Sequence, residues 1–429
     1  MIRYALFPLF LVACGSSQNG HTNTASGGAS GGGASSASTA GAAGTATASG
    51  GSSGSSAAAG AGNTGPLPPD ACIAAGTCPP GQWLNVTPTS VNLTGTFSCG
   101  NFGTESVVVD PNAPATLYAQ FNCQGIFKSM DYGLTWSGPI NTGMNGAAIT
   151  DTAGGIVIAP GQPAVLYSAG IRGTGTGIWV STNSGVDWTN YNISPSTKDR
   201  QDFYPPEVDP TDPNHLLMSG HEMDLMVESM DGAKTWTAIP IEAGMKENGG
   251  TGLVFFVNTG TPATTRKTWL WMAQQSGGTY GTWRTENGGT NWVMVDKNEH
   301  PHGLAQIYQP DTNGVVFMAG AYSGAGWGVL TSPDYGKTWT HVGSTSNLAL
   351  VVGTKNNLYA MYGWAAGPGT VVDPSLESAA QPGTGTWTMG MTPATMTQGP
   401  GHVAVTSDGS HAVLLAACFN GGLWRYVEP

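Results

Sequence analysis

The stretch SMDYGLTW at residues 129–136 recurs in four variants along the chain, and these five copies decide the fold. The variants are STNSGVDW at 181–188, SMDGAKTW at 229–236, TENGGTNW at 285–292 and SPDYGKTW at 332–339. In this pattern an Asp or Asn side chain accepts hydrogen bonds from nearby backbone N–H groups, Gly supplies a positive φ, and Trp packs beneath the turn. Copies that start 47 to 56 residues apart predict five equivalent tight hairpin turns. Two copies carry Asn for Asp and one carries Ala233 for Gly, so we expect looser turns there.

Each copy lies inside a longer unit with four short segments. These segments are apolar or alternate between apolar and polar residues, a pattern that predicts β-strands. In the first unit these segments are 107–111, 116–121, 125–129 and the residues from Trp136 onward. A repeated four-stranded unit of about 50 residues is typical of a β-propeller blade. A sixth unit lacks the turn pattern but keeps the segment LYAMY and a later GTW at residues 358–387.

The two ends of the repeat share one further unit. The C-terminal part supplies three segments, 403–405, 413–417 and 422–426, and QWLNVT at 82–87 reads as their missing fourth strand. We therefore predict an all-β, seven-bladed β-propeller over residues 82–429, closed by an N-terminal strand that joins the C-terminal three strands. Such closure removes the open sheet edges.

The repeated turn resembles the Asp-box, or BNR, repeat, S-x-D-x-G-x-x-W. This repeat occurs in sialidases, in the xyloglucan-cleaving endoglucanases, in the sortilin ectodomain and in a photosystem II assembly factor. The resemblance implies that the turns lie on one face of the propeller. It also implies that functional sites lie on the opposite face, in loops between blades and between the second and third strands of a blade. The repeat specifies a fold and not an activity.

Charge is scarce in this chain of 429 residues, which has 14 Lys and Arg, 26 Asp and Glu, and 65 Gly. Charged residues make up 9% of it, against about 25% in typical soluble domains. The absence of a Lys/Arg stripe argues against a nucleic-acid partner, and the lack of charged faces argues against helical bundles. No apolar run reaches the roughly 18 residues that a membrane helix needs.

The N-terminal residues 1–14 read as a secretory signal peptide, with Arg3 ahead of an apolar stretch. The end of this segment, LVAC at 11–14, resembles the bacterial lipobox, which implies that Cys14 is lipidated and becomes the first mature residue. An ordinary signal peptide cleaved nearby is the alternative. No Asp follows Cys14, which implies sorting to the outer membrane of the cell envelope. The membrane is then a partner through the lipid anchor.

Between this signal and the propeller lie two further segments. Residues 15–66 consist almost entirely of Gly, Ser, Ala and Thr and carry no formal charge, so we expect a disordered tether. Residues 67–81 form a lead-in that contains cysteines.

The cysteines agree with an exported protein. Cys72 and Cys78 flank a short loop, and we expect them to form a disulfide. Among the other three we favour a Cys99–Cys123 pair that leaves Cys418 free, although the sequence does not settle this connectivity.

In so charge-poor a chain, the charged and aromatic residues that gather in the loops opposite the repeated turns stand out. We expect four carboxyl groups to be catalytic as acids and bases: Asp202, Glu207, Glu222 and Asp224. We expect seven side chains to bind substrate: Arg172, Tyr204, His221, His300, His302, Trp327 and Trp364. The alternative is that polar residues gather there only because loops are exposed.

Glu207 occupies the slot of Val108 in the first unit and of Val157 in the second, on the strand that lines the central channel. A lone carboxyl group there would be partly buried and its pKa raised, which suits a general acid. An alignment slip of one residue would instead place it at a loop edge. The run HEMD at 221–224 lacks the helical spacing of a zinc motif, and we expect no metal and no cofactor.

Two functions fit these residues. The first is a surface-anchored enzyme that cleaves a polysaccharide, as a glycoside hydrolase or a lyase. The second is a non-catalytic module that binds a glycan or a protein through the same face. Sialidases clamp a carboxylate with three arginines, and no such motif is visible here. Xyloglucanases pair two propellers around a cleft, whereas this chain has one. We favour a hydrolase that acts on a glycan as a monomer.

Overall fold

The structure is a computed structural model, and all the residues that it describes belong to one compact unit, 48–429. The described residues are 69–100, 102–159, 165–196, 201–221, 223–242, 245, 252–273, 281–297, 306–319, 328–342, 348, 350–362, 375–383, 385–418 and 421–429. The α-helices within these ranges are short: α1 (Ala71–Ala74), α2 (Gly146–Thr150) and α3 (Pro262–Thr265). In the described ranges, no helix has the length and apolar character needed to span a bilayer.

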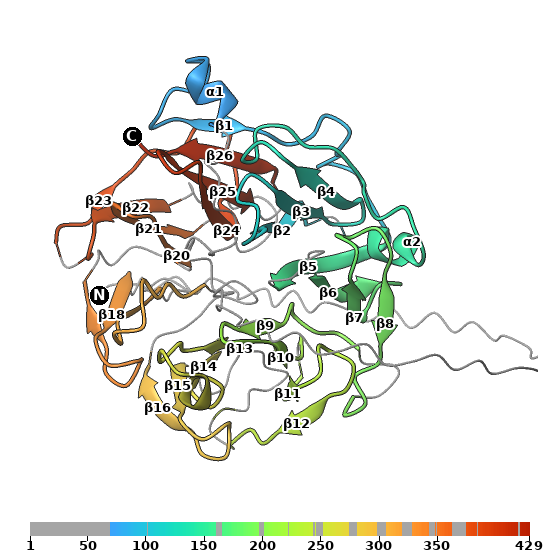
Figure 1. Ribbon diagram of the computed structural model, residues 1–429, viewed down its shortest axis with the longest axis vertical. Helices are drawn as coiled ribbons and strands as arrows, with labels where there is room; N and C mark the ends of the chain where they lie inside the picture. The colour runs from blue at the N-terminus through green and yellow to red at the C-terminus, as the bar shows by residue number, and fades with distance from the viewer. Residues whose placement is uncertain are drawn as a thin grey trace, which may run out of the picture. The chain divides into compact units, whose positions relative to one another are not determined.

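The strands form seven antiparallel sheets, which are the blades of a seven-bladed β-propeller (Figure 1). We number the blades 1 to 7 from β2. Blade 1 contains β2 (Thr104–Val109), β3 (Leu117–Phe121) and β4 (Gly125–Ser129). Blade 2 contains β5 (Thr152–Ala159), β6 (Val165–Gly173), β7 (Gly177–Ser181) and β8 (Thr189–Tyr191). Blade 3 contains β9 (Glu207–Asp209), β10 (Asp212–Ser219), β11 (Met226–Ser229) and β12 (Thr237–Ile239).

The later blades repeat this order, with the first strand of each blade innermost (Figure 1). Blades 4 and 5 contain β13 (Gly252–Phe256), β14 (Trp269–Ala273), β15 (Gly281–Thr285) and β16 (Val293–Asp296); and β17 (Val316–Ala319), β18 (Val329–Ser332) and β19 (Thr340–His341). Blades 6 and 7 contain β20 (Leu350–Gly353), β21 (Asn357–Tyr362), β22 (Ser375–Ala380) and β23 (Thr388–Met389); and β24 (Pro400–Ser407), β25 (Ala412–Cys418), β26 (Leu423–Val427) and β1 (Trp83–Asn85).

The predicted closure of the ring is confirmed by β1, which is the outermost strand of blade 7. Trp83 lies opposite Tyr426, and Asn85 lies opposite Trp424. Figure 1 shows β1 beside β26, although the two strands are far apart in the sequence. The N-terminal strand therefore completes a sheet whose other three strands come from the C-terminus.

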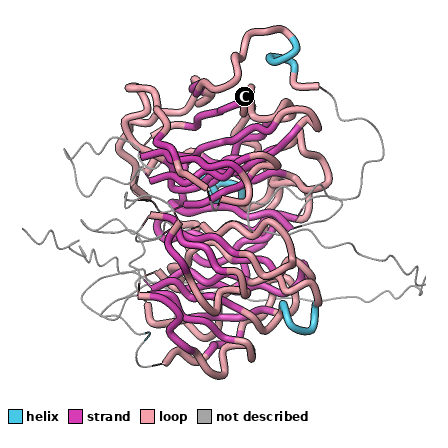
Figure 2. Tube along the Cα trace, turned by 90° about the vertical axis from the view of Figure 1, so that its left-hand side faces the viewer, coloured by secondary structure: helices cyan, strands magenta, loops and turns pink. Residues whose placement is uncertain are grey.

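The hydrophobic core lies between neighbouring blades. One cluster joins Tyr118 of blade 1 to Leu166 of blade 2, and another joins Leu350 of blade 6 to Val403 of blade 7. Seven such clusters of buried side chains link successive blades through the described residues. Figure 2 shows the strands in layers when viewed from the side. Apolar burial between sheets, worth about 25 cal/mol per Å², therefore ties each blade to the next.

The repeated turns share one set of hydrogen bonds. In the first copy, Gly133 N donates to Ser129 Oγ at 2.9 Å, and Trp136 Nε1 donates to Gly133 O at 3.0 Å. Asp131 Oδ1 accepts from the backbone N of Thr135 at 2.9 Å. These bonds fix the turn through the Ser and Asp side chains, the backbone and the indole of the Trp beneath it.

Our expectation of looser turns is wrong for two of the three variant copies. Asn183 Oδ1 accepts from Asp187 N at 2.9 Å, as Asp does elsewhere. Ala233 N still donates to Ser229 Oγ at 3.0 Å, because Ala233 adopts the left-handed φ of +71°. In the fourth copy, Trp292 Nε1 has no hydrogen-bond partner among the described residues, so that turn lacks one of the shared bonds.

The left-handed conformation of Ala233 is strained, but its buried methyl group offsets that strain. We expect Ala233→Gly to change the free energy of unfolding by less than about 1 kcal/mol. Removing Cβ relieves about 1–2 kcal/mol of strain, while the freer unfolded chain costs about 0.4–1 kcal/mol and the loss of a methyl group in the core costs about 0.8 kcal/mol. Urea unfolding followed by Trp fluorescence measures the change. The reverse substitution, Gly133→Ala, is the matched control and should destabilise, since a Cβ there would lie 2.6 Å from Leu415 Cδ1. A loss for Ala233→Gly as large as that for Gly133→Ala would contradict the expectation.

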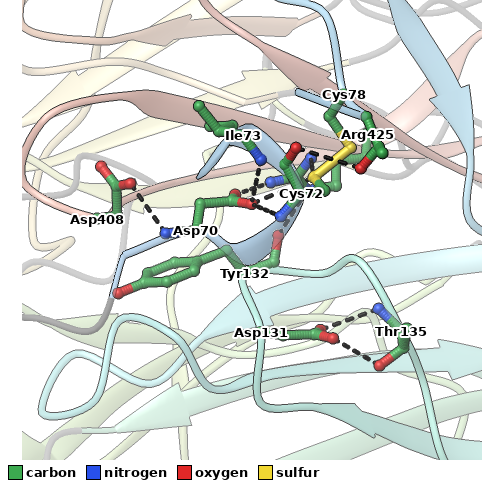
Figure 3. Close-up of a disulfide and its surroundings, with 10 residues drawn as sticks. Asp70, Cys72, Ile73, Cys78, Asp131, Tyr132, Thr135, Asp408 and Arg425 are labelled. Carbon is green, nitrogen blue, oxygen red and sulfur yellow. Dashed lines mark hydrogen bonds and ion pairs between the residues drawn. A yellow bond between two sulfur atoms is a disulfide. The ribbon is translucent and has the colours of Figure 1, made fainter. Parts of the chain in front are cut away.

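A buried ion pair fixes the lead-in to the last blade (Figure 3). The Asp70 carboxylate pairs with Arg425 of β26 and accepts from Cys72 N at 3.2 Å. Asp70 N donates to Asp408 Oδ2 at 3.1 Å. Arg425 Nε donates to Tyr132 O in the first repeated turn at 3.0 Å. One guanidinium therefore joins the lead-in, blade 7 and blade 1.

Two disulfides hold the residues that precede β2. The structure pairs Cys72 with Cys78 in the lead-in and Cys99 with Cys123, while Cys418 is a buried free thiol. Cys123 lies in the turn between β3 and β4, so its disulfide attaches the segment after β1 to blade 1.

Candidate functional site

Polar residues from three consecutive blades converge at the blade ends away from the repeated turns. The repeated turns follow β4, β7 and β11, so the β3–β4, β6–β7 and β10–β11 turns lie at the other end. At this end lie Glu105 on β2, Arg172 on β6, and Asp202 and His221 beside β10, which we call the blade-end cluster. Thr104, next to Glu105, pairs with Phe121, and Phe203, next to Asp202, pairs with Gly220, which precedes His221, so these residues lie at the same end of their blades. The charges of His221 and Arg172 lower the pKa of Glu105.

Glu105 is the extra residue of a β-bulge. Thr104 pairs with Phe121 and Ser106 pairs with Gln120, so Glu105 has no partner of its own on β3. Bulges re-aim a side chain and are frequent beside active sites. Glu105 is half-buried, and burial raises its pKa to about 7, although the Asn122 hydrogen bond and the charges of His221 and Arg172 lower it. This group therefore holds a proton in a large fraction of molecules at neutral pH.

Asn122 holds the Glu105 carboxyl group in place. Its Nδ2 donates to Glu105 Oε1 at 2.8 Å, and its Oδ1 accepts from Gly154 N at 3.2 Å. Asn122 is fully buried, and its backbone N donates to Gly103 O at 3.0 Å. The amide thus connects the bulge of blade 1 to β5 of blade 2.

Arg172 presents an exposed guanidinium near the end of β6. Its Cζ lies 5.0 Å from the centre of the Phe102 ring, within cation–π range. Phe102 lies three residues beyond Cys99, whose disulfide attaches this segment to the β3–β4 turn. The position of the cation is therefore supported by an aromatic ring on a covalently tied segment.

Blade 3 supplies His221 and Asp202, which are joined through both backbone and side chain. His221 N donates to Asp202 O at 3.0 Å, and His221 Nδ1 lies 3.9 Å from Asp202 Oδ2. Tyr204 packs edge-on against the His221 ring with 5.4 Å between ring centres. Tyr204 and His221 are each 6% exposed, so Tyr204 supports the imidazole and offers no open face for a sugar to stack on.

Glu207 lies on the innermost strand of blade 3, opposite Leu217 of β10. The registers give Val108 of β2 and Val157 of β5 the same place, opposite Tyr118 and Tyr167. Glu207 is half-buried, and burial raises its pKa well above the usual value. Its carboxyl group therefore keeps its proton to a higher pH than an exposed glutamate does.

His402 is a further titratable group on an innermost strand, β24 of blade 7. Burial lowers its pKa to about 4, against the opposite effect of a hydrogen bond with the backbone of Val107. The imidazole is therefore neutral at physiological pH. It contributes hydrogen-bonding capacity to the inner strands but no charge.

Of the remaining expected site residues, the structure describes only Asp224. Asp224 lies exposed in the β10–β11 turn, three residues beyond His221. The following lie outside the described residues: Glu222, His300, His302, Trp327, Trp364 and the expected lipidation site Cys14. Among the described residues, no group of three or more His, Cys, Asp or Glu side chains is arranged to hold a metal ion.

The sequence interpretation missed Glu105 and Asn122, although one signal was present. Thr104 pairs with Phe121 as Phe203 pairs with Gly220, so Glu105 is equivalent to Tyr204, which was among the expected site residues. The predicted first unit starts at residue 107, so the bulge lies outside the repeat alignment. The available signal was Glu105 itself, a carboxylate in a chain with few charges, at the position equivalent to the expected site residue Tyr204.

Comparison with known proteins agrees with the fold. No protein family and no curated protein sequence matches this chain. Its structure is similar to a GH74 enzyme from Niastella koreensis, with a TM-score of 0.55 and 16% identity, and to the GH74 xyloglucanase from Xanthomonas campestris, with 0.52 and 17%. Each match covers 80% of this chain and 53% of the other, so the chain spans about half the length of those enzymes. YCF48 from Cyanidioschyzon merolae matches with a TM-score of 0.47 and 12% identity, covering 80% and 98%.

Proposed function

We propose that the protein is a surface-anchored glycoside hydrolase that cleaves a polysaccharide with carboxyl groups on the face away from the repeated turns. The observation that carries this proposal is the half-buried Glu105 carboxyl group, which sits in a β-bulge, has a raised pKa and lies at the same blade end as Asp202 and His221. Glycoside hydrolysis needs one protonated and one ionised carboxyl group across the scissile bond. The fold shared with GH74 enzymes, one of them a xyloglucanase, supports a carbohydrate as the substrate class.

A polysaccharide panel tests the proposal. The full chain is incubated with neutral and acidic polysaccharides, and released reducing ends and unsaturated products are measured separately. We expect reducing ends without unsaturated products, and a large loss of turnover in Asp202→Asn. Unsaturated products would indicate a lyase. Binding to a glycan or a protein without turnover of any polysaccharide would overturn the enzyme and favour a non-catalytic module.

Surface anchoring is the second part of the proposal and rests on the lipobox-like LVAC at 11–14. We expect the protein to fractionate with membranes and Cys14→Ser to release it into the soluble fraction, because stable anchoring needs two or more acyl chains. Immunoblots of the two fractions from cells that export the chain measure this. Cys418→Ser is the matched control and should leave the partition unchanged. A Cys14→Ser protein that stays in the membrane fraction would contradict lipid anchoring.

A further inference from the structure

We propose that Glu105 is the proton donor of this site, a role that rests on the proposed function. Its carboxylic O–H gives the proton to the glycosidic oxygen as the bond from that oxygen to the anomeric carbon breaks. A water oxygen bonds to the anomeric carbon, and the water proton passes to the Asp202 carboxylate. The proton on Asp202 returns to Glu105 through solvent, so one water molecule is consumed for each bond cleaved.

The backbone directs this side chain to the blade end. As the unpaired residue of the bulge, Glu105 is released from the alternation that would otherwise fix its direction on β2. The residue sits one position inside the strand from Thr104, at the end of the blade where the β6–β7 and β10–β11 turns also lie. The bulge therefore presents a carboxyl group where side chains of blades 2 and 3 meet.

Among the described residues, the hydrogen bond of the Glu105 carboxyl group comes from Asn122 and holds one of its two oxygens. Asn122 Nδ2 donates to Oε1 at 2.8 Å, and Asn122 is itself fixed by Gly154 N and by its own backbone bond to Gly103 O. A positioned group within hydrogen-bond reach of the substrate is what general acid catalysis needs. Asn122 is a positioning residue in this arrangement.

The charges around Glu105 keep it able to give up its proton. Arg172 from blade 2 and His221 from blade 3 act on it through their charge, and Asn122 through its hydrogen bond. These three interactions lower the pKa of Glu105, burial raises it by more, and the resulting pKa is about 7. A carboxylic acid whose pKa lies near the working pH is protonated before the reaction and is stable as a carboxylate after it has given its proton to the substrate.

Glu207 is less suited to this role because it lies deeper. Glu105 is equivalent to Tyr204, and Glu207 follows Tyr204 by three residues along the innermost strand. At about 3.3 Å per residue, Glu207 lies roughly 10 Å farther from the blade end. Burial is the cause that raises its pKa, and among the described residues no hydrogen bond or charge opposes that effect. A polysaccharide that lies across the blade ends meets Glu105 first.

Leaving-group dependence tests the role. The full-length wild type, Glu105→Gln and Glu286→Gln are assayed on the polysaccharide that the wild type cleaves and on a dinitrophenyl glycoside of the same sugar. Dinitrophenolate departs without protonation, so it needs no acid. We expect Glu105→Gln to lower kcat on the polysaccharide about 10²–10⁴-fold and to lose the decline in rate above pH 7, while hydrolysis of the dinitrophenyl glycoside falls far less. Glu286 lies in the fourth repeated turn, ion-paired with Arg284 and Lys337, and its substitution should change neither rate.

The outcomes separate this role from the proposed function. Equal losses on both substrates would show that Glu105 supports the structure, and unchanged rates would show that another group donates the proton. Either result overturns the role while the hydrolase stands. Failure of the wild type to cleave any polysaccharide overturns the hydrolase and the role together. Circular dichroism melting of each variant identifies a loss of rate that comes from unfolding, and Glu105→Asp then replaces Glu105→Gln in the same comparison.

Discussion

Replacing Arg425 with methionine should lower the free energy of unfolding by about 3–5 kcal/mol, because it leaves the Asp70 carboxylate buried without its partner. Asp70 and Arg425 are each 1% exposed, so water cannot take the place of the missing charge. The substitution also removes the 3.0 Å bond to Tyr132 O. The lead-in, which places Cys72 and Cys78 in the core cluster between blades 7 and 1, should detach and become susceptible to proteolysis.

Urea unfolding at pH 7 and limited proteolysis measure this effect. Arg266→Met is the matched control, since Arg266 pairs with Asp212 at 3.2 Å but the two side chains are 40% and 28% exposed. Exposed pairs contribute about 0–1 kcal/mol. The double variant Asp70→Asn/Arg425→Met should recover part of the loss, because it removes the unpaired charge. A loss for Arg425→Met no larger than that for Arg266→Met would show that the buried pair does not hold the lead-in.

The number of blades and the closure of the ring were predictable because each repeated unit in the sequence corresponds to one blade. Turns of nearly constant sequence mark five blades, and a strand-like segment at 82–87 before the first unit must pair somewhere. The structure shortens that segment to β1, Trp83–Asn85. Strand ends depend on which backbone groups find partners, and residue patterns do not specify this. The expectation of a looser turn at Ala233 failed for a similar reason, since side-chain and backbone bonds together impose the left-handed φ.

The site was less predictable than the fold because its geometry depends on an irregularity. The interpretation from sequence pointed to the correct end of the blades for Arg172 and His221, and the strand registers give Glu207 the expected slot beside Val108 and Val157. A bulge adds one residue to one strand without leaving a periodic signature, so the orientation of Glu105 could not be read from alternation. Tyr204 matched the rim of a site by residue type, yet it is buried against His221.

A second buried charge network predicts a stability loss that depends on pH. His215 is 1% exposed, with Nδ1 2.8 Å from Asp209 Oδ2 and Nε2 2.9 Å from Glu228 Oε1. Burial lowers the pKa of His215, but the hydrogen bonds and charges of the two carboxylates outweigh burial and raise it. A raised pKa in the folded state means that folding favours the imidazolium. The resulting stability is fully present below the unfolded pKa of about 6.5 and is lost as the pH rises through the folded value.

His215→Gln should therefore lower the free energy of unfolding by about 3 kcal/mol at pH 6, where it leaves two carboxylates without a cation between them. The difference from the wild type should shrink at pH values above the folded pKa, where the wild type has also lost its charge. Urea unfolding of both proteins from pH 5.5 to 9 measures the two curves. His411→Gln is the matched control, because His411 is 38% exposed, and Asp408, although only 4% exposed, keeps its bonds from the backbone N–H groups of Asp70, Ser410 and residue 411, so the loss should be about 0–1 kcal/mol. If the His215→Gln difference were constant across this range, His215 would be a neutral hydrogen-bond bridge between β9, β10 and β11, and its contribution to stability would not come from charge.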